Sequence, residues 1–140
     1  MVNNNLKAEL ILLCDYALVS QDGKLSILGV FDELRTQEDV AVLSRGFLVA
    51  TISGNPSKTY TLSVKAETGQ KKNNILPPLE ITTQTGLNGK ANILLEIQGV
   101  SFPQQGKYTF KIYNGNIEVG SKEMQVIKVK KNELKEKLVN

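Results

Sequence analysis

Turn-forming sequences divide this chain into short apolar segments, and this division constrains the fold more than any other feature. Gly, Asn, Asp and Pro cluster between the apolar runs, and no long helical pattern separates them. The turn sequences are Asp22-Gly23, Ser53-Gly54-Asn55-Pro56, Thr68-Gly69, Asn88-Gly89 and Asn114-Gly115. This spacing predicts an all-β fold of seven to eight strands in two packed antiparallel sheets, a β-sandwich.

Three segments alternate apolar and polar residues with the period of two that is typical of a half-buried strand. They are residues 60–66, 93–97 and 108–112. Other runs are more continuously apolar, and we expect them to form the middle of the sheets. These runs are residues 10–14, 25–31 and 47–52.

Two connections carry local signals. Asp22-Gly23 stands between apolar runs, and an Asp-Gly pair supplies the positive φ that a tight two-residue turn demands, so we expect a β-hairpin there. Residues 34–45 could hold one helical turn, because Thr36 and Asp39 have the spacing of a capping box.

The chain has 140 residues, the usual size of one domain. We expect a single β-sandwich domain over residues 1–129. Residues 130–140 form a lysine-rich C-terminal extension that is either a short helix or frayed, since Leu134 and Leu138 lie one helical turn apart.

The net charge of +3 belongs to the C-terminal end. Residues 128–140 hold five lysines and two glutamates, whereas the preceding residues hold as many acidic as basic side chains. No aromatic residue that could stack on bases is interleaved with those lysines, so the sequence does not indicate a nucleic-acid partner.

The N-terminal residues lack the pattern of a secretory signal, and no apolar run approaches the roughly 20 residues that span a bilayer. Cys14 is the only cysteine, which suits a reducing compartment. We therefore expect a cytoplasmic protein without a membrane span.

The segment around the first hairpin carries a resemblance to a known family. Cys14-Asp15-Tyr16-Ala17, then Gly23-Lys24-Leu25 and Gly29-Val30-Phe31-Asp32, resembles the N-terminal pattern of a small bacterial family catalogued as a domain of unknown function. The resemblance implies a small β-sandwich and supplies no reaction. We expect structural roles for Cys14, Gly29 and Phe31.

A second resemblance concerns Gly106-Lys107-Tyr108-Thr109-Phe110, which is similar to the Gly-x-Tyr-x-Cys segment of immunoglobulin domains. Phe110 stands in place of the cysteine, and the chain has no tryptophan. The sequence therefore indicates immunoglobulin-like architecture without the disulfide, with Gly106, Tyr108 and Phe110 as structural residues.

The absence of histidine excludes Ser-His and Cys-His catalysis and histidine-based metal sites. Cys14 lies in an apolar run, where a thiol packs as a small hydrophobic group. We expect neither a catalytic residue nor a cofactor.

Asp15, Asp32 and Asp39 fall near strand ends, where loops of a sandwich could gather them around calcium. No Asp-x-Asp-x-Asp-Gly loop is present, and aspartates at strand ends more often cap or bend the backbone.

We therefore expect a non-enzymatic binding or assembly module that acts through an exposed sheet edge or its loops. Its partner is another protein or a second copy of the chain. The alternative is a module that binds a small ligand or calcium through Asp15, Asp32 and Asp39.

Overall fold

The computed structural model describes residues 6–68 and 73–130 and contains ten strands in that part of the chain. Apart from Lys130, the predicted C-terminal extension lies outside the described residues. The strands are β1 (Lys7–Val19), β2 (Leu25–Phe31), β3 (Glu33–Thr36), β4 (Ala41–Ser53), β5 (Thr59–Thr68), β6 (Asn73–Asn74), β7 (Leu79–Gln84), β8 (Lys90–Phe102), β9 (Gly106–Asn114) and β10 (Ile117–Lys128).

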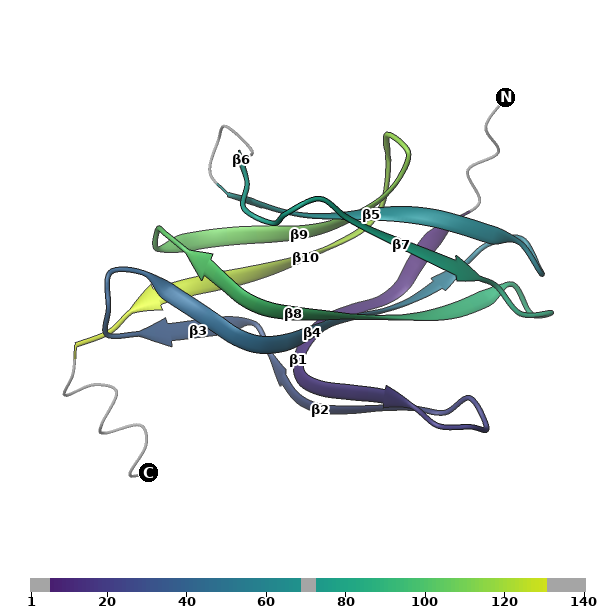
Figure 1. The fold of residues 1–140 in the computed structure, drawn as a ribbon, viewed down its shortest axis with the longest axis horizontal. Coiled ribbons are helices and arrows are strands. Elements are labelled where there is room, and N and C mark those ends of the chain that lie inside the picture. The colour runs from purple at the N-terminus through teal and green to yellow at the C-terminus, as the bar shows by residue number, and fades with distance from the viewer. Residues whose placement is uncertain (1–5, 69–72, 131–140) are drawn as a thin grey trace.

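The strands form two sheets that pack against each other (Figure 1). The first has the order β2-β1-β4-β8, and the second has the order β3-β10-β9-β5-β6, with β7 also paired to β5. The pairs are antiparallel except β3 with β10, which is parallel. The prediction of an all-β sandwich of two packed sheets is confirmed, and among the described strands β3 is the one that departs from antiparallel pairing.

The short strand β3 lies at the start of a connection for which the sequence predicted a helical turn. The expected helical turn in residues 34–45 is wrong, because β3 follows the open edge of β10 there. The Gln125 and Val129 amides donate to the carbonyls of Asp32 and Thr36 at 2.9 and 2.8 Å. These backbone bonds satisfy polar groups that a single helical turn would leave without partners.

The main core lies between the sheets and follows the predicted alternation. Tyr60, Leu62, Val64 and Ala66 on β5 are all buried, and so are the alternate residues of β9. Leu13, Leu48, Ala50 and Ile93 face them from the first sheet. Because every second residue of these strands is apolar, each sheet can bury one face against the other.

Tyr108 ties the start of β9 to the preceding turn. Its hydroxyl group donates to the Gln104 carbonyl at 2.8 Å and accepts from the Gln104 amide at 3.0 Å. The ring meets Phe102 edge to face, with 5.0 Å between centroids, and Phe110 is fully buried beside them. This is the geometry of a tyrosine corner.

The first hairpin has a three-residue loop. The Ser20 amide donates to the Lys24 carbonyl at 2.9 Å, so Gln21, Asp22 and Gly23 lie between the last paired residues. The expected two-residue turn is therefore wrong. Gly23, with φ of 84°, provides the left-handed residue that closes a three-residue loop.

Candidate functional site

The second half of β1 and most of β2 form a two-stranded arm, residues 15–30, that leaves the first sheet. β1 pairs with β4 only as far as Cys14, whereas its pairing with β2 continues to Val19. In Figure 1, β1 bends sharply and returns with β2 beneath β4 and β8. The arm therefore adds a partial third layer to the sandwich.

Gly29 and Asp15 lie at the bend. Gly29 has φ of 70°, and a Cβ at this position would overlap the Asp15 carboxylate. Only glycine accepts both the left-handed backbone and this contact without strain. The bend therefore requires glycine at position 29.

One face of the arm is buried against the outside of the first sheet. There, a second apolar cluster joins Ala17, Leu25 and Ile27 of the arm to strands β1, β4 and β8. The residues contributed by those strands are Leu12, Cys14, Phe47, Val49 and Leu94. Because the arm covers this sheet, both faces of β4 are buried near Phe47, which accounts for its continuous apolar run.

The arm also exposes large apolar side chains to solvent. On β2, Leu28 is 64% exposed and Val30 is 62% exposed. Tyr16, the cross-strand partner of Leu28, and Leu18 on β1 are about two-fifths exposed. We call Tyr16, Leu18, Leu28 and Val30 the exposed apolar set. Apolar side chains grouped in this way are characteristic of interaction surfaces.

This arrangement corrects one expectation from the sequence. The sequence predicts residues 25–31 in the middle of a sheet, but β2 is an edge strand whose one partner in the described part of the chain is β1. The apolar run arises because Ile27 packs inward while Leu28 and Val30 stay exposed. The glycine inside the run was the signal that the strand is bent.

Arg45 links the arm to the outer surface of β4. Its guanidinium lies 5.8 Å from the ring centroids of both Tyr16 and Phe47, and these rings meet edge to face. Glu96 holds the other side of Arg45 in an ion pair with an N···O distance of 2.6 Å. These contacts fix Tyr16 at the rim of the exposed apolar set.

The three candidate calcium ligands do not come together. Asp15 lies over Gly29, the Asp32 carbonyl accepts a bond from Gln125, and Asp39 pairs with Lys128. The hydrogen bond from Lys128 holds the pKa of Asp39 below its usual value. Within residues 6–68 and 73–130, no three acidic or cysteine side chains are grouped as a metal site requires.

Cys14 is fully buried in the second cluster, and its thiol donates to the Tyr16 carbonyl at 3.4 Å. Burial raises the pKa of this thiol, and the neighbouring Asp15 charge raises it further. A thiol held in this form is a poor nucleophile.

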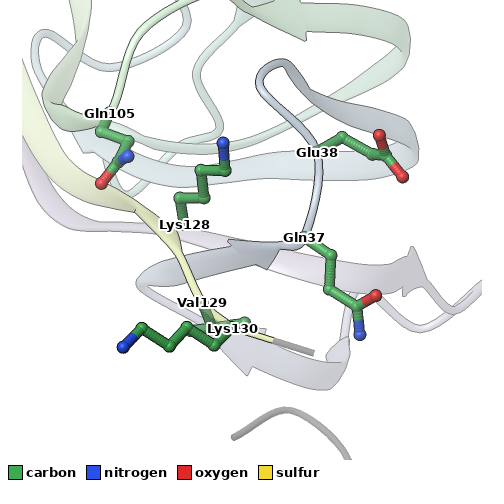
Figure 2. A pocket seen from close by; sticks show the side chains of 6 residues that line it. All are labelled: Gln37, Glu38, Gln105, Lys128, Val129 and Lys130. Carbon is green, nitrogen blue, oxygen red and sulfur yellow. The ribbon is translucent and has the colours of Figure 1, made fainter. Parts of the chain in front are cut away.

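An open polar cleft of about 510 Å³ lies at the end of the sandwich where β10 finishes (Figure 2). Its walls come from the β3–β4 loop, the β8–β9 turn and the end of β10; the residues are Gln37, Glu38, Gln105, Lys128, Val129 and Lys130. The ammonium group of Lys128, one of the lining residues, forms an ion pair with Asp39.

The sequence model of one protein family matches most of this chain. The model described as "Family of unknown function (DUF6941)" matches residues 9–127. The chain belongs to this family. The expected membership of a family without an assigned activity is therefore confirmed, and the segments that carried the resemblance are those that build the arm of this DUF6941 protein.

Comparison with curated proteins gave no match. Among solved structures, an immunoglobulin-like protein from Pseudomonas aeruginosa is similar to this DUF6941 chain, with 12% identity and a TM-score of 0.46. The match covers 87% of this chain and 96% of that protein. No helix among the described residues is long and apolar enough to cross a bilayer.

Proposed function

We propose that this chain is a non-enzymatic protein-binding module and that it binds through the exposed apolar set of the arm. The observation that carries the proposal is the exposure of Leu28 and Val30, at 64% and 62%, on a strand whose neighbour Ile27 is packed inward. Apolar surface left in water costs free energy that a protein partner would recover on binding.

The structure of the arm supports this surface as a binding site. The second apolar cluster holds its inner face, and Arg45 fixes Tyr16 at its rim. A surface held in one conformation loses little entropy when a partner docks. In addition, β2 has an open edge that can pair with a strand from the partner.

The reactive groups of the described residues support a non-enzymatic role. Cys14 is buried with a raised pKa, and Lys111 is held in an ion pair with Glu67 at 3.0 Å. Neither Cys14 nor Lys111 lines any of the clefts found among the described residues. The exposed apolar set therefore provides an apolar contact surface, and neither Cys14 nor Lys111 adds a reactive group to it.

The test compares affinity capture by three forms of the full chain. The Leu28→Lys/Val30→Lys variant places two charges in the exposed apolar set, and Val42→Lys places one charge on β4, where Val42 is 59% exposed. We expect one or more proteins captured by the native chain and by Val42→Lys to be lost with the double variant. Each such protein is then purified and its binding measured directly. Equal binding to the native chain and the double variant would overturn the proposal.

A further inference from the structure

The open edge of β2 has features that select its partner. Among the described residues β2 pairs with β1 on one side only, so alternate amide and carbonyl groups on its other side have no described strand opposite them. An unpaired edge of this kind is a template for adding a strand. Three observations limit which strand it can accept.

The charges at the two ends of β2 favour an antiparallel partner of the same sequence. Leu25–Phe31 contains no charged residue, while Lys24 precedes it and Asp32 follows it. A second copy in antiparallel orientation, with Gly29 opposite Gly29, would place its Asp32 opposite Ser26 and diagonal to Lys24. A parallel copy would instead place like charges at each end, which is unfavourable.

The bend at Gly29 restricts the partner further. A strand that pairs along the whole of β2 must bend at the same place, because neighbouring strands of a sheet follow each other. A second copy satisfies this requirement when Gly29 lies opposite Gly29, since a two-fold axis through that point superimposes the two bends.

That register also brings together the two most exposed side chains of β2. Leu28 would lie opposite Val30 of the second copy, and Val30 would lie opposite Leu28 of the second copy. Aliphatic side chains directly opposite each other stabilise an antiparallel pair. The contact is the same on both sides of the two-fold axis, as a closed dimer requires.

We propose that this chain forms a dimer in which the two β2 strands pair antiparallel, centred on Gly29. The two four-stranded sheets then become one continuous sheet. This inference rests on the proposed function, because it names a second copy as the protein that the arm binds.

The experiment is sedimentation equilibrium of the full chain over a wide range of concentration. The native chain and Val42→Lys are expected to dimerise. Leu28→Lys/Val30→Lys is expected to dimerise at least about tenfold more weakly, because lysines would lie opposite lysines across the two-fold axis. Circular dichroism checks that each variant is folded.

The register has its own test. In Leu28→Lys/Val30→Glu, each lysine would lie opposite a glutamate of the second copy, so dimerisation should be retained. A dimer centred on Leu28 would instead place lysine against lysine, and this variant would separate it. An equimolar mixture of the Lys/Lys chain and a Leu28→Glu/Val30→Glu chain should form a mixed dimer.

The outcomes separate this inference from the proposed function. A native chain that stays monomeric, while Leu28→Lys/Val30→Lys still loses a captured protein, overturns the dimer and leaves the binding module in place. A native dimer that the double lysine variant does not weaken places self-association elsewhere and overturns the inference. If the double variant changes neither association nor capture, both proposals are wrong.

Discussion

The Asp15 carboxylate occupies the space beside the Cα of Gly29 that a side chain at position 29 would need. The residues on either side of this contact are paired, Cys14 with Val30 and Tyr16 with Leu28. The bend of the arm therefore depends on an acidic side chain on one strand and a missing side chain on the other.

Gly29→Ala should destabilise the protein by more than Gly23→Ala. Both glycines have positive φ, so both substitutions carry a backbone cost of about 1–3 kcal/mol. At Gly23 the new Cβ meets nothing within 4 Å, whereas at Gly29 it meets Asp15. Urea denaturation measures the free energy of unfolding.

The Asp15→Ala/Gly29→Ala double variant isolates the contact itself. Removing the carboxylate should recover part of the loss caused by Gly29→Ala, which appears as a coupling energy in a double-mutant cycle. Strictly additive effects would show that the overlap does not shape the bend.

Tyr108→Phe should lower the free energy of unfolding by about 1–3 kcal/mol, because the Gln104 amide and carbonyl would both lose their bonds to the hydroxyl group. Tyr16→Phe is the matched control, since its ring lies at the surface of the arm. Thermal denaturation followed by circular dichroism provides the measurement. Equal melting temperatures for the two variants would contradict the corner role of Tyr108.

Stability should fall in alkaline solution through Lys111 and Tyr113. The side chains of Lys111 and Glu67 are only 17% and 12% exposed, and the hydrogen bond from Lys111 to Glu67 raises the pKa of Lys111 above its ordinary 10.5. Burial, with the Glu67 charge, raises the pKa of Tyr113 above 10.0.

Both shifts have the same sign. The folded protein holds these protons more tightly than the unfolded chain, so the stabilisation is complete below the ordinary values and is lost as pH rises through the folded ones. Denaturation measured from neutral pH upward should therefore show a decline beginning above about pH 10. Lys111→Met should show a shallower decline; an unchanged slope would mean that Lys111 does not contribute.

Ile27→Asp should expose Cys14 to thiol reagents without unfolding the sandwich. Ile27 and Cys14 belong to the second apolar cluster, so a charge at position 27 weakens the packing of the arm against the first sheet. The matched control is Ser26→Asp, one residue away on the exposed side of β2. Labelling of the native chain and the control should be slow, and labelling of Ile27→Asp faster; equal rates would show that the arm does not protect Cys14.

Much of the sandwich could be predicted because its strands bury one face. Residues 60–66 and 108–112 alternate as they do because β5 and β9 each face the main core on one side only. The tyrosine corner was also predictable, since the Tyr108 hydroxyl group bonds to Gln104, a residue close in sequence.

The arm could not be predicted from the same pattern. The run 25–31 contains apolar residues that pack inward and apolar residues that face solvent, and only the bend at Gly29 separates the two. β3 was missed because its four residues are held by the edge of a distant strand rather than by their own periodicity. Likewise, the spacing of Asp15, Asp32 and Asp39 gives no information about the different partners that each one meets.

The surface against which the arm packs consists largely of side chains from β1, β4 and β8, including Phe47, Val49 and Leu94. We therefore expect the arm to dock after those strands have assembled and to detach while they stay intact. Local opening of the arm should then require less free energy than global unfolding. A partner that binds the docked arm would shift this opening equilibrium toward the closed form. The rate at which the buried Cys14 thiol reacts would then fall when a partner occupies the exposed apolar set, although Cys14 does not contact that surface.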